Sequence, residues 1–300
     1  MEPPEILRRV AVGRIPISFD MHESEVTSLH RPPTFYIMAP RQSYLPLVAR
    51  SARESFEEAA PDVGASGVWF EHDGKPLRWN IPIGVLFDFH RSSLSVSSSS
   101  SSSQQSTIIN DDLPFKITIR FQGFPKTNLL PCAGEIDAEN AFFNSMKQAL
   151  CLRFGSAKGL MEMPKSNQEN LWEGIVFGKF EKYWQSCGPL LSTVDQMDSQ
   201  HQTPQVPIRV LLRADDISLE GGARVLQASV PLIDETLTLK DAIATVLKSN
   251  GRDPDEEDWM RIRVSIQGVA PPLSSFVKEI CDEMCSHDLF LYVVVFLPSK

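Results

Sequence analysis

Apolar and polar residues alternate over several short stretches of the chain, and this two-residue period indicates β-strands. The clearest case is FKITIRFQ at 115–122, in which every second side chain is apolar. Further strands are predicted at 14–20, 34–40, 68–79, 207–214, 223–231, 261–268 and 290–297. The 68–79 stretch contains Asp73-Gly74, a dipeptide that favours a hairpin turn.

A period of about 3.6 residues, which is typical of helices, occurs between these strands. It predicts helices at 44–58, 137–155, 169–185 and 239–250. The last of these has Thr238 as its predicted N-cap, with Asp241 three residues on and Gly251 as a stop. Gly174 and Gly178 lie away from the apolar arc of the third helix. They indicate either close approach of a neighbouring segment or simple tolerance of glycine.

The order of elements is the same in the first and last parts of the chain: strands, a helix, then more strands. This order is typical of the β-grasp fold. We therefore predict an α+β protein in which two ubiquitin-like (β-grasp) domains flank a helix-rich domain. The predicted boundaries are 1–126 (with an N-terminal helix), 127–205 and 206–300. The serine-rich run at 94–106 is of low complexity, so a disordered insertion is expected over 91–110, and 192–205 reads as a linker.

The composition argues against a nucleic-acid-binding, secreted or membrane-spanning protein. The 300 residues are 42% hydrophobic and 22% charged, with a net charge of −9, which argues against general nucleic-acid binding. The N-terminus lacks a signal-peptide core, and the longest apolar run, 289–298, has half the length of a membrane span. The five cysteines form no CxxC pair. Reduced thiols in the cytosol are expected.

No catalytic motif is found. CDEMCSHD at 281–288 is the one metal-like cluster, but no second ligand pair accompanies it, so we predict neither a metal site nor a cofactor. A thiol hydrolase built on Cys151 or Cys187 would require a histidine placed by the fold. The acidic run at 253–258 is expected to be a solvated loop. The sequence predicts a protein-binding protein with no catalytic residue.

The helix at 137–155 carries one lysine of interest. Ile136, Phe142, Phe143, Met146, Leu150 and Phe154 fall within an arc of about 120° on a helical projection. Lys147 lies about 20° outside this arc. Taken alone, Lys147 is an ordinary boundary lysine whose stem lies on apolar surface. Glu139 lies near the centre of the arc, where a carboxylate requires a partner inside the domain, a bound protein, or open solvent.

Five segments resemble, in order, the autophagy protein 5 family. They are GRIP (13–16), APRQSYLPLV (39–48), HDGKPLRWNIPIGVLFD (72–88), NLWEGIVFGKFEKYW (170–184) and IQGVAPPL (266–273). The resemblance covers nearly the whole chain outside the serine run. Members of this family consist of two ubiquitin-like domains flanking a helix-rich domain, which agrees with the architecture predicted from the pattern.

The resemblance implies a role for Lys147. NSMKQAL (144–150) is similar to the segment in which family members accept autophagy protein 12 through an isopeptide bond, transferred by E1-like and E2-like enzymes. It further implies that a helix of autophagy protein 16 lies in a groove of this chain. The assembled complex would act like an E3 in the lipidation of autophagy protein 8. The expected location is cytoplasmic, with peripheral contact on the pre-autophagosomal membrane.

Four further residues are candidates for partner binding: Pro40, Arg41, Trp79 and Glu139. Buried structural roles remain open for Pro40 and Trp79. The alternative to the whole assignment is a β-grasp adaptor that binds proteins without being conjugated, in which Lys147 is only a surface lysine. Neither interpretation requires a catalytic site in this chain.

Overall fold

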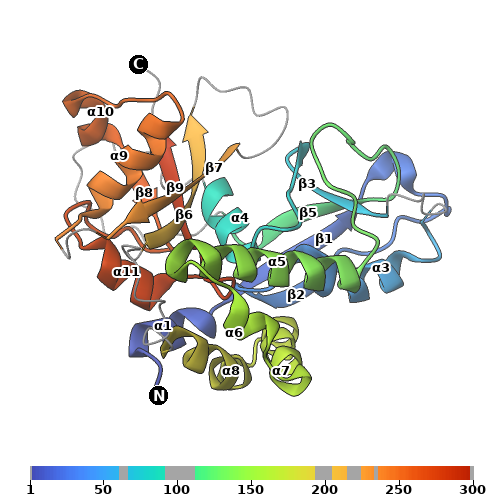
Figure 1. Ribbon diagram of the computed structural model, residues 1–300. Helices are drawn as coiled ribbons and strands as arrows, with labels where there is room; N and C mark the ends of the chain where they lie inside the picture. The colour runs from blue at the N-terminus through green and yellow to red at the C-terminus, as the bar shows by residue number, and fades with distance from the viewer. Residues whose placement is uncertain are drawn as a thin grey trace, which may run out of the picture.

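The computed structural model describes residues 2–60, 67–91, 112–192, 205–214, 224–232 and 236–297. Two β-sheets lie at opposite ends of the molecule, and helices run between and beneath them (Figure 1). The long helix α5 (Glu135–Phe154) passes in front of both. The predicted serine-rich insertion and most of the predicted linker at 192–205 lie outside the described residues.

The first sheet has the strand order β2-β1-β5-β3-β4, with β1 parallel to β5 and its other pairings antiparallel. The turn between β3 and β4 is made by Asp73 and Gly74, both with positive φ (48° and 72°), as the sequence predicts. The elements are α1 (Glu5–Ala11), β1 (Arg14–Met21), η1 (Glu23–Glu25), β2 (Phe35–Pro40), α2 (Leu45–Val48), α3 (Arg50–Phe56), β3 (Trp69–His72), β4 (Lys75–Pro76), α4 (Ile83–His90) and β5 (Phe115–Arg120).

The second sheet repeats the arrangement with four strands in the order β7-β6-β9-β8, and β6 is parallel to β9. Each sheet therefore joins its first strand to its last in parallel, which gives both the β-grasp connection. The capping box of α9 is present, because Thr238 accepts from the backbone of Asp241 and the Asp241 side chain accepts in return. The elements are β6 (Gln205–Ala214), β7 (Arg224–Pro231), α9 (Leu239–Ser249), α10 (Glu256–Arg261), β8 (Arg263–Ser265), α11 (Val277–Met284) and β9 (Leu291–Leu297).

The helices between the sheets are α5, α6 (Lys158–Met161), α7 (Lys165–Phe177) and α8 (Phe180–Ser192). The prediction of one helix over 169–185 is wrong. Gly178 adopts a left-handed conformation (φ 64°), which ends α7 and lets α8 fold back. A Cβ atom on Gly174 would lie 2.6 Å from the Cβ of Tyr183, so the glycine permits close approach of the two helices. Close approach, one of the two interpretations of Gly174, is confirmed.

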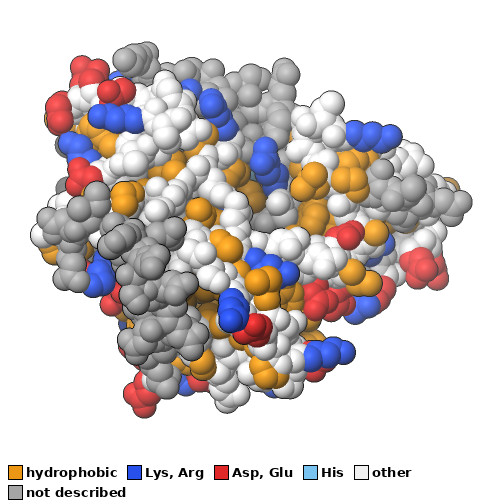
Figure 2. Space-filling model, in the orientation of Figure 1, with side chains coloured by type: hydrophobic (Ala, Val, Ile, Leu, Met, Phe, Trp, Pro, Cys, Tyr) orange, Lys and Arg blue, Asp and Glu red, His pale blue; other side chains and the backbone are white. Residues whose placement is uncertain are grey.

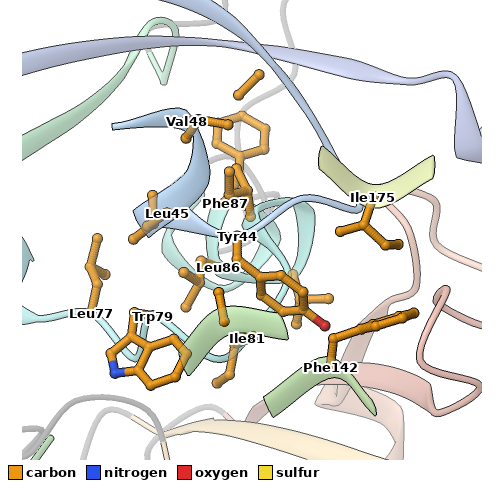
Figure 3. Packing of buried hydrophobic residues seen from close by; sticks show 14 of the residues in the cluster. Tyr44, Leu45, Val48, Leu77, Trp79, Ile81, Leu86, Phe87, Phe142 and Ile175 are labelled. Carbon is orange, nitrogen blue, oxygen red and sulfur yellow. The ribbon is translucent and has the colours of Figure 1, made fainter. Parts of the chain in front are cut away.

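Hydrophobic side chains form two clusters. The larger cluster joins the first domain to the helices, and residues from α2, α4, α5 and α7 converge in it (Figure 3). The smaller cluster lies between the second sheet and the helices α9 and α11. Strand β9 contributes to both, since Val293 faces the smaller cluster and Val294 the larger. This explains why β9 is apolar at almost every position.

The structure corrects two further local predictions and adds one helix that was not predicted. The acidic run at 253–258 is not a loop throughout, because Asp255 caps α10 through a capping box with Asp258. Acidic residues in a first helical turn are stabilised by the helix dipole, which the loop interpretation ignored. The predicted strand at 261–268 shortens to β8, and α4 was not predicted because it is buried on nearly all sides and shows no amphipathic period.

Candidate functional site

Helix α5 begins after Gly134 and ends at Gly155, whose positive φ (74°) lets its N–H bond to the carbonyl of Cys151. Its buried face differs from the predicted arc. The buried residues are Ala138, Phe142, Met146, Ala149 and Leu150. Ile136, assigned to the arc, is 74% exposed. Ala138 and Ala149 belong to the buried face, but the predicted arc counted only large apolar residues. With the two alanines included, the centre of the buried face lies about 40° from the centre of the predicted arc.

Because the buried face differs from the predicted arc, Lys147 lies farther from the core than the sequence predicted. On a helical projection it lies about 120° from the centre of the buried face, so it is on the exposed side and not at the rim. Among the residues that the structure describes, none forms a hydrogen bond or ion pair with its ammonium group. Its amine therefore faces solvent from a helix whose other side is firmly packed.

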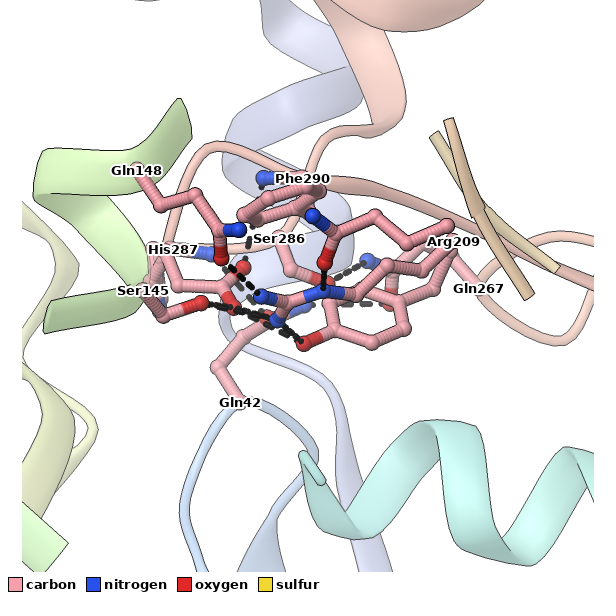
Figure 4. A network of polar contacts seen from close by, with 11 residues as sticks. Gln42, Ser145, Gln148, Arg209, Gln267, Ser286, His287 and Phe290 are labelled. Carbon is pink, nitrogen blue, oxygen red and sulfur yellow. Dashed lines mark hydrogen bonds and ion pairs between the residues drawn. The ribbon is translucent and has the colours of Figure 1, made fainter. Parts of the chain in front are cut away.

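A polar network fixes α5 to the second sheet immediately beside this lysine (Figure 4). The guanidinium of Arg209, on β6, donates to Ser145 Oγ at 2.8 Å and to Gln148 Oε1 at 3.1 Å. It also bonds to Asp288 Oδ2 at 3.2 Å and Tyr292 Oη at 2.6 Å. Ser145 donates in turn to Asp288 at 2.7 Å. Two α5 residues that flank Lys147 are thereby attached to the second domain.

The network is shielded from water, which strengthens its electrostatics. The Asp288 side chain is 1% exposed and that of Arg209 15%. The Arg209 guanidinium also lies 3.6 Å from the centre of the Phe290 ring, in cation–π contact. Burial, with the nearby Asp288 carboxylate, raises the pKa of the Tyr292 hydroxyl, so it remains a donor. The position of α5 against the second sheet is thus set by directional contacts as well as by apolar packing.

A groove of about 700 Å³ runs along α5. Its wall includes Asn144 and Gln148 of the helix, Trp79 of the first domain and Arg209 of the second. The face in Figure 2 is hollowed between the two halves, with hydrophobic and charged side chains interspersed. Trp79 is itself buried (7% exposed) and donates from Nε1 to the carbonyl of Leu130 at 2.8 Å. Its indole is part of the core shown in Figure 3.

The other candidate partner-binding residues lie in different places. Glu139 is half-buried on α5, and no residue in the described part of the chain hydrogen-bonds its carboxylate. Pro40 is buried at the end of β2, where a Cβ on Gly178 would lie 3.0 Å from its ring. Arg41 pairs with the buried Asp88 of α4 and also donates to the carbonyl of Gly84. These contacts give Pro40 and Arg41 internal packing roles, while their contact with a partner stays a prediction.

The Arg209 network was not predicted from the sequence. One signal was present: two arginines, Arg209 and Arg213, interrupt the apolar strand PIRVLLRA, and Asp288 directly precedes the most apolar run of the chain. A charge within a buried strand requires a partner. The pattern could not indicate Ser145 and Gln148, which are far away in sequence.

The described residues contain no group of three or more His, Cys, Asp or Glu side chains arranged to hold a metal ion. No helix among them is long and apolar enough to cross a bilayer.

His287 is buried against Tyr183, with ring centres 4.1 Å apart, and neither ring nitrogen has a hydrogen-bond partner. Burial lowers its pKa to about 3, so it is neutral. The two β-grasp sheets and the helices between them place the chain among proteins that are built from ubiquitin-like domains.

Sequence comparison identifies the family within this class. Sequence models of Autophagy protein ATG5 match residues 10–121 (UblA domain), 135–193 (alpha-helical bundle region) and 205–295 (UblB domain). The chain belongs to the autophagy protein 5 family, and its role is in autophagy.

Individual relatives agree with this assignment. The chain is 27% identical to Autophagy protein 5 of Arabidopsis thaliana, with 98% of each chain covered. It is 34% identical to that of Oryza sativa subsp. indica over 60% of this chain and 42% of the relative. The crystal structure of Kluyveromyces marxianus Atg5 superimposes with a TM-score of 0.70 at 22% identity, covering 97% of this chain and 99% of that one. The predicted fold, two ubiquitin-like domains flanking a helical region, is confirmed.

Proposed function

We propose that Lys147 is the acceptor through which this chain is joined covalently to autophagy protein 12. The observation that carries the proposal is the setting of Lys147: an exposed amine, unpaired among the described residues, on a helix fixed by a buried network. Order in the helix lowers the entropy that is lost when the amine is aligned with a reactive group.

The chemistry requires little from this chain. The neutral ε-amine attacks the thioester that links the modifier to an E2-like enzyme. An isopeptide bond forms, and the E2 thiol leaves. The enzymes supply activation, while this chain supplies a positioned nucleophile and a docking surface. This assigns it a scaffold role with no catalytic residue of its own.

The wider assembly follows from the same proposal. An amphipathic helix of autophagy protein 16 would bind in an apolar groove of this chain. A cavity of about 570 Å³ has suitable walls, with Leu7 of α1, Trp184 of α8 and Leu289 of the second domain among its lining residues. The complex would act like an E3 in the lipidation of autophagy protein 8, as a peripheral component on the pre-autophagosomal membrane. Pro40, Arg41, Trp79 and Glu139 remain candidates for partner contact.

The test is reconstitution with the modifier and its E1-like and E2-like enzymes, followed by denaturing, reducing electrophoresis and peptide mass spectrometry. We expect a branched peptide at Lys147, and Lys147→Arg should abolish the heavier species. Lys165→Arg is the matched control, since Lys165 is also exposed on a helix. Conjugation that persists in Lys147→Arg would refute the assignment. A chain that is never conjugated but still binds its partners would support the adaptor alternative.

A further inference from the structure

Two cysteines lie in contact at the end of α11. The Sγ atoms of Cys281 and Cys285 are 3.0 Å apart, and both residues are buried. Residues four apart on an α-helix have Cα atoms about 6 Å from each other, which falls within the range of roughly 4.4–6.8 Å found in disulfides. Cys285 is the C-cap of the helix and has left the helical conformation (ψ 145°). Little movement is therefore required to bring the two sulfurs to bonding distance.

The surroundings give the thiols a route for small reagents and a nearby positive charge. Both cysteines line the cavity of about 570 Å³ described above, together with Arg153 and His287. Arg153 forms an ion pair with Asp282 at 3.0 Å, beside Cys281. The two sulfurs thus combine mutual contact, access through a cavity and a guanidinium neighbour, the features of a reactive dithiol.

We propose that Cys281 and Cys285 form a dithiol site that a hydroperoxide oxidises to a reversible disulfide. The Cys281 thiolate attacks one peroxide oxygen, giving a sulfenic acid and releasing the other oxygen as water or an alcohol. The Cys285 sulfur then attacks the sulfenic sulfur and expels water. Two thiols lose two electrons and two protons, and the peroxide gains them.

The order of attack follows from the environment of each sulfur. The hydrogen bond from the Cys285 thiol, aided by the positive charge of Arg153, lowers the pKa of Cys281. Burial acts in the opposite direction elsewhere, raising the pKa of Cys187 to about 12 and that of Cys132 to about 11. Because the thiolate is the nucleophile, Cys281 should react before either of these buried cysteines.

The disulfide would alter a connection within the fold. Only two residues, Ser286 and His287, separate Cys285 from Asp288, whose carboxylate anchors the Arg209 network. Bonding Cys285 to Cys281 would tie the end of α11 to the start of this connecting segment. A change in the redox state of the pair would therefore act close to the contacts that hold α5 on the second sheet.

The test treats the full chain with a small excess of hydrogen peroxide, blocks free thiols with iodoacetamide and maps the peptides by mass spectrometry. We expect a Cys281–Cys285 disulfide that dithiothreitol reverses. In Cys285→Ser, the sulfenic acid cannot be resolved, and dimedone should label Cys281. Cys151→Ser is the control, because Cys151 is exposed, and its disulfide yield should equal that of the unmodified chain.

Two results would overturn the proposal. One is full alkylation of both Cys281 and Cys285 after peroxide has oxidised Cys151. The other is conversion of the pair to sulfinic acids with no disulfide at any peroxide dose. Circular dichroism of each variant before treatment separates a loss of reactivity from a loss of fold.

Discussion

The two faces of the second sheet are built differently, although the same strands form both. On one face β6 presents Ile208, Val210 and Leu212 to the helices of its own domain, in a wholly apolar core. On the other face the same strand presents Arg209 and Arg213 on either side of Leu211. Each arginine reaches a different helix of the rest of the molecule.

The contacts of these arginines show what the second face does. Arg209 bonds to α5, while Arg213 donates to the carbonyls of Phe89 and Arg91 at 3.0 and 3.1 Å, at the end of α4. A cation beside the last carbonyls of a helix is favoured by its dipole. The apolar face thus stabilises the domain, whereas the arginine-bearing face sets its orientation on the remainder of the chain.

The largest effect is expected from Arg209→Ala. It leaves the Asp288 carboxylate buried and without its cation, which costs about 3–5 kcal/mol in the free energy of unfolding. Urea denaturation followed by circular dichroism measures the loss. The comparison variant is Arg213→Ala, which removes two hydrogen bonds to neutral carbonyls and a cation–π contact with Phe296. It leaves no buried carboxylate without its cation and should cost less. Equal losses in the two variants would contradict the central role given to the ion pair.

A double substitution sharpens this prediction. In Arg209→Met/Asp288→Asn the buried charges disappear together, so much of the stability lost in Arg209→Ala should return. The orientation of α5 should nevertheless remain less well defined. Amide hydrogen exchange in α5 would then be faster than in the unmodified chain, even where the free energy of unfolding is similar.

The second prediction concerns pH and compares His90 of the first domain with His287 beside the second. Burial, aided for His90 by the neighbouring His72, lowers each pKa from 6.5 to about 3. The folded state therefore binds fewer protons than the unfolded chain between these values, and stability falls as pH drops below about 6.5. At pH 5 each histidine should cost about 2 kcal/mol relative to pH 7.

Phenylalanine substitutions separate the two contributions. His287→Phe should remove its share of the pH dependence with little other cost, because neither ring nitrogen has a partner. His90→Phe should do the same for the first domain. Urea denaturation at pH 5 and pH 7 gives the difference for each variant. An unchanged slope in His287→Phe would show that this imidazole is not held neutral by burial.

The third prediction uses neighbouring residues of β9 that face different cores. Val293→Ala and Val294→Ala remove the same atoms and should each cost about 2 kcal/mol. Val293 faces the core of the second domain alone, so its loss should accelerate hydrogen exchange in α9 and α11. Val294 faces the shared core, and its loss should affect α4 and α5. Identical exchange patterns would mean that the two cores unfold as one.

The same contrast explains what could be predicted from the sequence. Strands β1, β5 and β9 and the cap of α9 depend on local pattern and were predicted correctly. Helix α4 is buried on nearly all sides and therefore shows no amphipathic period, and the break at Gly178 is a left-handed glycine C-cap, which an apolar period does not reveal. The sequence correctly placed Lys147 on a helix. It placed the lysine too near the buried face, because two buried alanines were not counted in that face. The Arg209 network joins residues that are far apart in sequence, so no local pattern could predict it.

The smallest effect is expected from a helix cap, a feature that α9 of the second domain has and α11 of the same domain lacks. Helices α3 and α4 of the first domain have no side-chain cap and depend on packing, whereas α9 has a complete capping box. Thr238→Ala should therefore cost about 1 kcal/mol. Thr245→Ala in the same helix is the matched control, because Thr245 is exposed in the helix interior, where alanine is the better helix former. Urea denaturation should show a loss in Thr238→Ala and none in Thr245→Ala. Equal values for the two would mean that packing, and not the capping box, holds α9 in place, as it holds α4.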